Sequence, residues 1–456
     1  MAPIPRQNGG STQSDLFYHI GMSTEVEDLS RYKQHGLHPI ILGQVLPEAK
    51  TCVDVPDKEP SYRIMFKLGF GAFSTVWMAR DMVEDRWVSV KICEGSEKAT
   101  KSAEVAILTE IRDTFQGKPG FNHIIQLLDT FIIKGPNGFH ECIVTEIIAS
   151  LADYSFINEA SSAVSVRQIA QAFALLHEHG IAHGDPHPAN VGVTLPQMDG
   201  IDENAIVSNF PQEQLVPVAP RSATFPRETV PAYAVPKESL VSWLRSRRVL
   251  PGEGELQIKI LDFGRAHRTS DEASALLGAV PPIVQPPETV IYHLSDRKLG
   301  SPWSQAADVW AVACIMFYTL GDGELLSASW SRMDECLLRC LELGGPPIEA
   351  WAEFVRPKLD LPSRGPCSFG GFAVPMSRAE IENTNVLCAP GHYYTDRDLV
   401  WEKQAARCYC KGEQREAFVD LLKRMIVTDP EQRISMQEVL AHPFCLREWP
   451  SSQPVE

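Results

Sequence analysis

Two side chains suited to phosphoryl transfer stand on one short, proline-punctuated loop. Residues 181–190 read Ile-Ala-His-Gly-Asp-Pro-His-Pro-Ala-Asn, so the carboxylate of Asp185 precedes the amide of Asn190 by five positions. An Asp-Phe-Gly begins at Asp262, directly after an apolar stretch that predicts a strand. Phosphoryl transfer needs such a set: one Asp to orient the attacking hydroxyl, and an Asn and a second Asp to hold magnesium. The alternative is a structural turn beside an unrelated Asp-Phe-Gly.

A glycine-rich turn precedes this loop in the order that nucleotide binding requires. Alternating apolar residues from Tyr62 onward predict a strand that runs into Gly69-Phe-Gly71. Glycines allow the backbone to approach a triphosphate closely. The predicted ATP-binding stretch comprises Leu68, Gly69, Phe70, Gly71, Ala72, Phe73, Ser74, Thr75 and Val76. Ser74 stands where the usual pattern has its third glycine, and Val76 is placed to cover adenine. The alternative to a nucleotide-binding loop is a plain hairpin turn.

The next strand carries a lysine that needs anionic partners. In residues 87–93, Val88, Val90 and Ile92 point one way and Lys91 the other. An unpaired ammonium on a largely buried strand is costly, so phosphates and a carboxylate are the expected partners. On the helix that follows, Glu110 is the predicted carboxylate partner. The alternative is that Glu110 is a solvated residue on the helix surface. Residues 141–148 are predicted to form a strand that leaves the first of two lobes. The backbone of this strand at Glu146 and Ile148 could form hydrogen bonds with adenine.

Three further charges are predicted to support the second half of the chain. Residues 301–318 form an almost wholly apolar helix, and Asp308 near its start can cap backbone amides of the catalytic loop. A buried Arg433 would pair with Glu288 and hold the end of the segment after Gly264, unless the two form a plain surface pair. The proline-rich insertion 191–258 is predicted to be mostly an extended surface segment.

Composition narrows the class of protein. The chain has 456 residues and a formal net charge of −16, which argues against direct nucleic-acid binding and permits a basic substrate. It has no run of about eighteen apolar residues, and therefore no expected membrane span. Its cysteines lack metal-ligand spacing, which favours reduced thiols.

The expected fold is α+β and bilobal. We predict a disordered arm at 1–24, a lead-in at 25–60, and a small antiparallel-sheet lobe with one key helix at 61–148. A mostly helical lobe containing the 191–258 insertion follows at 149–446, and a tail at 447–456.

Together, these motifs resemble a eukaryotic-type protein kinase over roughly residues 60–445. The stretches 68–77, 109–112, 126–129 and 135–138, with Asp28-Leu-Ser-Arg-Tyr and His38-Pro, narrow the resemblance to the SR-protein kinases, particularly fungal ones. The resemblance implies that Lys91 and Glu110 position ATP, Asp185 is the catalytic base, and Asn190 and Asp262 hold Mg²⁺. It implies a serine/threonine kinase that acts as a monomer on Arg/Ser-rich proteins of mRNA processing, in the cytoplasm, the nucleus or both.

The resemblance also carries departures and a docking prediction. His187 replaces the loop lysine that usually contacts the transferred phosphate, and Gly184 replaces the Arg before the catalytic Asp, an Arg that the SR-protein kinases also lack. Glu335 and Glu342, seven residues apart on a predicted helix, match an acidic pair that docks arginine-rich substrate in that family. A solvated acidic helix face is the alternative.

Two other functional classes stay open from the sequence. The His183-Gly-Asp-x-His-Pro-x-Asn190 pattern is similar to the loop of small-molecule phosphotransferases such as aminoglycoside and choline kinases. Those enzymes are not expected to carry the set Glu288, Asp308 and Arg433. A pseudokinase scaffold is the third class, kept open by His187 and opposed by the remaining catalytic side chains.

Overall fold

The computed structural model describes residues 16–18, 26–152, 159–208, 215–246, 257–270, 280–326, 333–359, 374–376, 392–394 and 397–449. Most of the predicted disordered arm and most of the predicted tail lie outside these residues. The chain divides into two compact units. The first comprises Met1–Thr114, Ile125–Ala149 and Thr194–Pro251, and the second comprises Phe115–Ile124, Ser150–Val193 and Gly252–Glu456.

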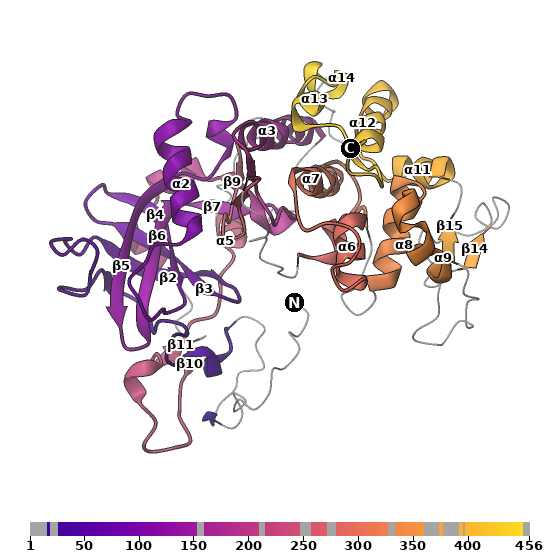
Figure 1. The fold of residues 1–456 in the computed structure, drawn as a ribbon. Coiled ribbons are helices and arrows are strands. Elements are labelled where there is room, and N and C mark those ends of the chain that lie inside the picture. The colour runs from indigo at the N-terminus through magenta and orange to yellow at the C-terminus, as the bar shows by residue number, and fades with distance from the viewer. Residues whose placement is uncertain are drawn as a thin grey trace. The chain divides into compact units, whose positions relative to one another are not determined.

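The first unit is built on a six-stranded sheet in the order β1-β2-β3-β4-β6-β5, with all neighbours antiparallel. Helix α2 (Ala103–Thr114) lies across it (Figure 1). The strands are β1 (Val45–Leu46), β2 (Tyr62–Phe70), β3 (Ser74–Asp81), β4 (Arg86–Cys93), β5 (Leu127–Gly135) and β6 (Gly138–Glu146). On β4, Val88, Val90 and Ile92 are buried in the core as their alternation predicts. The predicted small antiparallel sheet with one key helix is therefore confirmed.

The lead-in packs on this sheet through buried charges. It contains the short 3-10 helix η1 (Leu29–Arg31). The carboxylate of Glu27 lies 2.5 Å from the ammonium of Lys67 on β2, and both side chains are buried. The Tyr32 hydroxyl also donates to Glu27. A buried Lys would be costly alone, so this pairing fastens the lead-in to the strand that enters the glycine turn.

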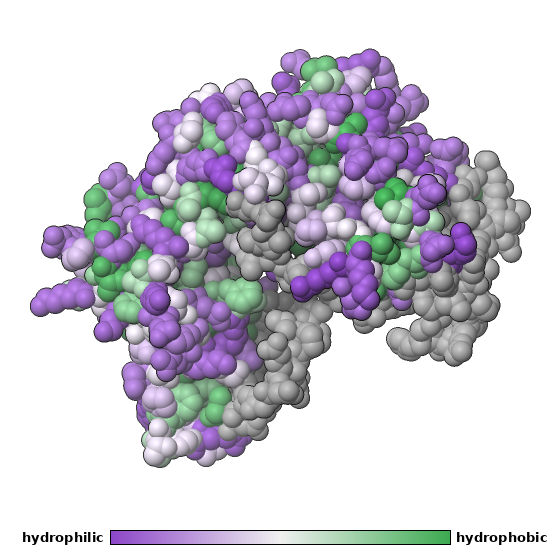
Figure 2. Space-filling model, in the orientation of Figure 1, coloured by the Kyte–Doolittle hydropathy of each residue, from purple (hydrophilic) through white to green (hydrophobic). Residues whose placement is uncertain are grey.

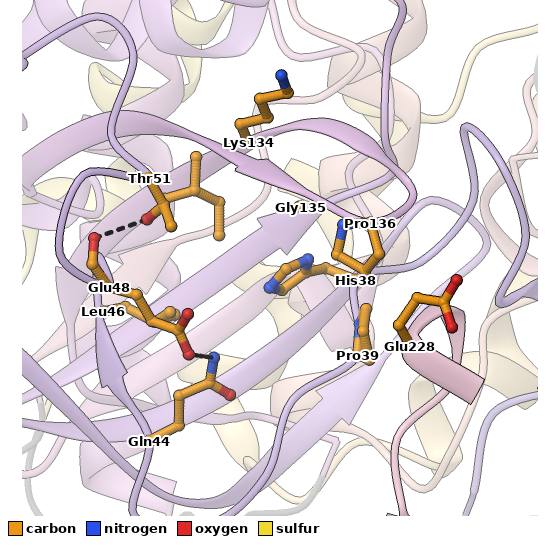
Figure 3. A pocket seen from close by; sticks show the side chains of 11 residues that line it. His38, Pro39, Gln44, Leu46, Glu48, Thr51, Lys134, Gly135, Pro136 and Glu228 are labelled. Carbon is orange, nitrogen blue, oxygen red and sulfur yellow. Dashed lines mark hydrogen bonds between the residues drawn. The ribbon is translucent and has the colours of Figure 1, made fainter. Parts of the chain in front are cut away.

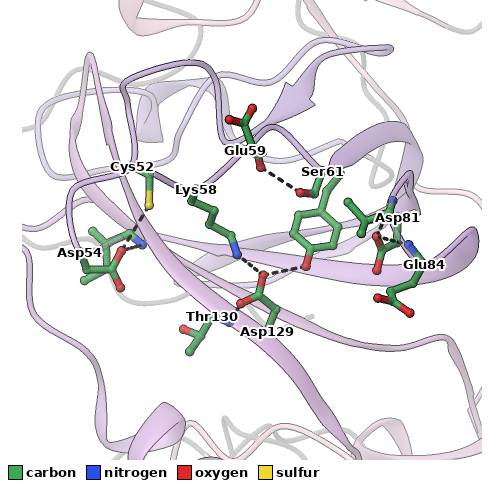
Figure 4. Close-up of polar contacts among 12 residues, drawn as sticks. Cys52, Asp54, Lys58, Glu59, Ser61, Asp81, Glu84, Asp129 and Thr130 are labelled. Carbon is green, nitrogen blue, oxygen red and sulfur yellow. Dashed lines mark hydrogen bonds and ion pairs between the residues drawn. The ribbon is translucent and has the colours of Figure 1, made fainter. Parts of the chain in front are cut away.

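A second polar cluster holds the end of the lead-in (Figure 4). The Lys58 ammonium and the Tyr62 hydroxyl both donate to one carboxylate oxygen of Asp129 on β5, at 2.5 and 2.6 Å. Both contacts join segments that are distant in sequence, so the lead-in is an integral part of the first unit.

The proline-rich insertion was predicted to lie within the second lobe. In the structure, Thr194–Pro251 belongs to the first unit. Its Ile201 and Thr229 carbonyls accept hydrogen bonds from the side chains of Trp87 (3.0 Å) and Asn137 (2.7 Å). Its elements are η4 (Pro196–Gly200), α4 (Glu203–Val207), β10 (Val216–Pro217), η6 (Arg227–Thr229), β11 (Tyr233–Ala234) and α5 (Leu240–Ser246).

The insertion is also less extended than predicted. Strands β10 and β11 form an antiparallel pair, and Leu240–Ser246 forms the helix α5. Val230 and Ala234 enter a small core with Leu29, Tyr32 and Leu37 of the lead-in. Apolar residues scattered between prolines show no regular period, yet each can be buried once a neighbouring segment supplies the other side of the core.

The second unit is mainly helical, as predicted. Its core is α7 (Gln305–Leu320), of which almost every residue is buried, and α3 (Glu159–Glu178) packs against it. The other helices are η2 (Phe121–His123), η3 (Pro188–Asn190), η7 (Pro282–Val284), α6 (Pro287–Leu294), α8 (Met333–Gly344), α9 (Glu349–Leu359), α11 (Arg397–Ala406), α12 (Gly412–Met425), α13 (Met436–Leu440) and α14 (Pro443–Leu446). The short strands are β8 (Ile181–Ala182), β9 (Val191–Thr194), β12 (Ile258–Ile260), β13 (His267–Arg268), β14 (Val374–Met376) and β15 (His392–Tyr394), and β7 (Ile148–Ser150) spans the boundary between the units.

The visible surface and the helices agree with the composition. Hydrophilic side chains dominate the face drawn in Figure 2, and hydrophobic ones are scattered among them. Among the described helices, none combines the length and apolar character needed to cross a membrane.

Candidate active site

The glycine turn joins β2 to β3 and leaves open space above its backbone. A Cβ added at Gly69 or Gly71 would meet no atom of the described structure within 4 Å. The Gly71 N–H donates to the Ser74 carbonyl at 2.9 Å, which closes the turn. The Arg31 guanidinium of the lead-in donates to the Gly71 carbonyl at 3.0 Å and pairs with Glu94. The turn is thus braced from the side, while the face over its glycines stays accessible to a ligand.

Lys91 has a carboxylate partner, but it differs from the predicted one. The Lys91 ammonium lies 2.8 and 2.9 Å from the two carboxylate oxygens of Glu104, in the first turn of α2. Val76 stands opposite Lys91 in the β3–β4 register. The sequence reasoning therefore missed Glu104, which lies on the same helix as the predicted Glu110.

The phase of helix α2 explains why the sequence reasoning missed Glu104. The buried positions of α2 are Glu104, Val105, Ile107, Leu108 and Ile111, which recur at helical spacing and form the face toward the sheet. Glu110 falls beside this face and is only partly buried. Several phases of a short helix bury some apolar residues, so the pattern alone does not select Glu104 over Glu110.

The other predicted nucleotide residues of the first unit lie at the ends of strands. Glu146 ends β6, where its carboxylate accepts the Gln126 N–H at 2.9 Å, and Ile148 begins β7. Both residues are partly exposed.

A separate pocket of about 320 Å³ lies in the same unit (Figure 3). It is formed by the lead-in, the β5–β6 hairpin and Glu228 of the insertion, and shares no residue with the predicted ATP-binding set. His38 lines it, and burial, with a contribution from nearby His140, lowers the pKa of His38 to about 3.

In the second unit, strand pairing brings Asn190 and Asp262 together. Val191 of β9 stands opposite Ile260 of β12, and the Leu261 N–H donates to the Asn190 carbonyl at 2.8 Å. Asp262 comes one residue later, with a left-handed φ of +56°. A non-glycine residue with positive φ is strained, and such strain is common at functional sites. Two residues 72 positions apart in sequence thus lie near each other at one end of the paired strands β9 and β12.

Asp308 positions the loop that carries Asp185. Its carboxylate accepts the backbone N–H groups of His183 at 2.7 Å and Gly184 at 3.2 Å, so the predicted cap is present. Trp303 and His177 also bond to this fully buried carboxylate, at 2.7 and 3.0 Å. Within the loop, the Asn190 amide donates to the Asp185 carbonyl at 2.9 Å. Buried acceptors bonded to main-chain donors hold a loop in one conformation.

Asp185 lies beside Arg265 and His187. The Nε atom of Arg265 is 3.4 Å and Nε2 of His187 is 3.9 Å from its Oδ2 atom. Burial raises the pKa of Asp185 to about 7, and the charge of Arg265 opposes this rise. The sequence reasoning missed Arg265, whose only visible sign was its place directly after Asp-Phe-Gly.

Gly184 and β13 explain how Arg265 reaches this position. Strand β13 pairs with β8, with His267 opposite Ala182, which brings the preceding residues back along the catalytic loop. Gly184 has a φ of +84°, and a Cβ there would stand 2.3 Å from the Arg265 carbonyl oxygen. Any side chain at 184 would push this segment away.

The predicted pair between Glu288 and Arg433 is present and fully buried. The two nitrogens Nη1 and Nη2 of Arg433 bind Oε1 and Oε2 of Glu288 at 2.8 and 2.9 Å, in a bidentate arrangement. Neither side chain has measurable exposure. Arg433 also donates to the Val427 and Ala306 carbonyls. The pair therefore ties α6 to the turn between α12 and α13 and is not a plain surface pair.

Comparison with known proteins decides the family. The sequence profile of the protein kinase domain matches residues 62–197 and 249–445. Between the two matched stretches, residues 198–248 of the insertion are not matched. The chain belongs to the protein kinase family. The predicted resemblance and the fold class are thereby confirmed.

Several curated relatives of this chain are protein kinases by name, and one of them is named as an SRSF protein kinase. Serine/threonine-protein kinase SKY1 of Saccharomyces cerevisiae is 34% identical over 38% of this chain and 24% of its own length. Protein kinase dsk1 of Schizosaccharomyces pombe is 27% identical over 90% of this chain and 83% of its own. SRSF protein kinase 3 of Homo sapiens is 30% identical over 41% of this chain and 32% of its own. The kinase thus spans about a quarter of SKY1 but most of dsk1.

The structure corrects the predicted acidic docking pair of the kinase. Glu335 is partly exposed, but Glu342 is only 4% exposed, and its carboxylate accepts two hydrogen bonds from buried Arg339 at 2.6 and 2.7 Å. Helix α11 packs against α8, where Trp401 and Arg397 donate to the Leu343 carbonyl. Helix α6 packs against α8 as well, and all residues of α8 from Cys336 to Gly344 are buried, so Glu342 is not a surface docking residue.

The structure also changes the expectation for His187. Its Nδ1 atom accepts the Ala189 N–H at 3.2 Å and caps η3. Burial lowers the pKa of His187 to about 4, with a smaller contribution from His183. Because the folded-state pKa lies below the ordinary value, the imidazole is neutral from pH 6 to 8 and cannot replace an ammonium.

A prediction follows for the pH dependence of the kinase. We expect His187→Gln, which keeps a side-chain acceptor, to leave the shape of the kcat profile between pH 6 and 8 unchanged. Steady-state rates at several pH values measure this. An acidic limb that is present in the native enzyme and lost in the variant would show that His187 titrates in this range.

Proposed function

We propose that this kinase transfers the γ-phosphate of ATP to serine or threonine of a protein substrate. The observation that carries the proposal is the β9–β12 pairing, which sets Asn190 beside the start of Asp-Phe-Gly while Asp308 fixes the loop bearing Asp185. Family membership and the names of the relatives support the same chemistry.

The first unit would bind the nucleotide. Lys91, oriented by Glu104, would contact the phosphates of ATP, and the open backbone at Gly69 and Gly71 would cover them. The pairing matters because a carboxylate at 2.8 Å limits the rotamers of the lysine. Backbone groups near Glu146 and Ile148 are the proposed contacts to adenine.

The donor set of the second unit suits magnesium. Asn190 and Asp262 provide an amide oxygen and a carboxylate, and Mg²⁺ takes oxygen ligands from few side chains together with water and phosphate. Among the described residues, no group of three or more His, Cys, Asp or Glu side chains is arranged to hold a metal ion. When bound, Mg²⁺ supplies positive charge to the phosphate oxygens.

Asp185 would orient the attacking hydroxyl. Its carboxylate accepts the hydroxyl proton as the oxygen of serine or threonine bonds to the γ-phosphorus, and the electron pair of the broken bond leaves on ADP. The contacts of Asp308 hold the loop before the substrate arrives, so little conformational freedom is lost in the reaction.

A basic, Arg/Ser-rich protein is the proposed substrate class. The net charge of −16 favours attraction of a cationic segment, and SRSF protein kinase 3 is among the relatives. Glu335 is the member of the predicted acidic pair that could contact such a segment. A role in mRNA processing in the cytoplasm or nucleus, action as a monomer, and absence of direct nucleic-acid binding remain predictions.

The test is a radiolabelled ATP assay with three acceptors: an Arg-Ser repeat peptide, a generic basic protein and an aminoglycoside. We expect label on the Arg-Ser peptide with magnesium present, and a rising KM for that peptide as salt screens the charges. Label on the aminoglycoside alone would favour a small-molecule phosphotransferase. No label on any acceptor, with ATP still bound, would favour a scaffold.

A second experiment separates the two candidate carboxylates on α2. Glu104→Gln should lower kcat/KM for ATP by about 10- to 100-fold, the size expected for a lost hydrogen bond to a charged group. Glu110→Gln is the matched control on the same helix and should change it less than about threefold. The reverse ranking would make Glu110, and not Glu104, the carboxylate that orients Lys91.

A further inference from the structure

Arg265 is the charged side chain nearest to Asp185 that the functions described above do not use. Its Nε atom is 3.4 Å from Oδ2 of Asp185, and its Nη1 atom is buried without a hydrogen-bond partner among the described residues. The Oδ1 atom of Asp185 is likewise buried and unpartnered. Buried donors and acceptors are normally satisfied, and the exceptions often mark groups that act on a ligand.

The catalytic loop itself lacks a cation at the usual place. His187 stands where the resembled family has a lysine, and it is neutral and engaged as the cap of η3. Charge accumulates on the oxygens of a transferring phosphoryl group, and a fixed cation there stabilises the transition state. A guanidinium is always charged and binds phosphate through paired donors.

We infer that Arg265 supplies the cation that His187 cannot: it contacts the transferring phosphoryl group and holds the carboxylate of Asp185 beside it. The inference rests on the proposed function. As the hydroxyl oxygen bonds to phosphorus, the proton passes to Asp185 and the electron pair of the broken bond leaves on ADP. Throughout this step, Arg265 keeps its proton and contributes only positive charge and hydrogen bonds.

The local backbone supports a specific placement of Arg265. The β8–β13 pairing returns the segment after Asp-Phe-Gly to the catalytic loop, and Gly184 admits it at a distance that no side chain would allow. Arg268, three residues later, instead donates to the His179 carbonyl at 3.3 Å. Two arginines of one segment thus have different neighbours: Arg265 lies against Asp185, and Arg268 bonds to the His179 carbonyl.

The test is a kinetic comparison of the full chain with Arg265→Gln, Arg265→Lys and Arg268→Gln. Arg265→Gln should lower kcat by at least about 30-fold with the KM for ATP within about threefold, because losing one transition-state donor costs about 10²–10³-fold elsewhere. Arg265→Lys keeps the charge and should retain kcat within about tenfold. Arg268→Gln controls for disturbance of the segment and should keep kcat.

Rescue distinguishes a catalytic charge from a structural one. His187→Lys in the Arg265→Gln background should recover at least about tenfold in kcat, while in the native background it should change kcat by no more than a few-fold. Failure of this rescue would overturn the inference. So would equal losses of kcat in Arg265→Gln and Arg265→Lys, or a native kcat in Arg265→Gln. These outcomes leave the proposed function intact if Asp185→Asn is inactive, whereas an inactive native chain would count against the proposed function itself.

Discussion

Replacing Asp185 with asparagine should lower kcat for an Arg-Ser peptide by about 10²–10⁴-fold, the usual contribution of a positioned general base. The affinity for ATP should stay within about twofold, because the proposed nucleotide contacts come from Lys91 and the glycine turn. Asparagine has almost the shape of aspartate, and the Asp185 carbonyl that accepts the Asn190 amide is unchanged. Single-turnover rates and ATP titrations measure the two effects.

The control for this prediction is Asp398→Asn. The Asp398 side chain is 87% exposed and its contact with Lys423 is 3.3 Å long. The substitution by asparagine should therefore leave both kcat and the affinity for ATP unchanged. Phosphorylation by Asp185→Asn at the native rate would rule out Asp185 as the base. A large loss of ATP affinity in the same variant would instead place the nucleotide against this carboxylate.

Breaking the buried pair between Glu288 and Arg433 should destabilise the second unit by about 3–5 kcal/mol, because removing one partner leaves an uncompensated buried charge. Glu288→Gln tests this by denaturant unfolding. Arg433 has two carbonyl contacts besides Glu288, so the stranded guanidinium stays in place without a counter-charge. Activity should fall with the folded fraction.

Two further variants sharpen this prediction. The double variant Glu288→Gln/Arg433→Met buries no charge and should be more stable than Glu288→Gln alone. Arg424→Ala removes an exposed pair with Asp420 on α12 and should cost no more than about 0.5 kcal/mol. Equal losses for Glu288→Gln and Arg424→Ala would mean that burial contributes nothing to the first pair.

The sequence alone determined the parts of this kinase that are local. Asp185 and Asn190 lie on one tight loop, and Gly69 and Gly71 on one turn, so their spacing along the chain already limits their spacing in space. The alternation on β4 and the apolar run of α7 also predicted burial correctly, because one face of a strand and an all-apolar helix have few alternatives. Charges on such elements, including Asp308 and Arg433, then required partners.

The tertiary structure decided the features that depend on a neighbour distant in sequence. Glu104 and Glu110 lie on the same helix, and the packing of α2 buries Glu104 beside Lys91. Glu342 is buried because other helices, α6 and α11 among them, pack against α8. The insertion belongs to the first unit because the lead-in completes its small core. Arg265 meets Asp185 because β13 turns back along β8. In each case the free energy comes from surfaces that meet only in the folded chain, and a pattern within one segment carries no record of its partner.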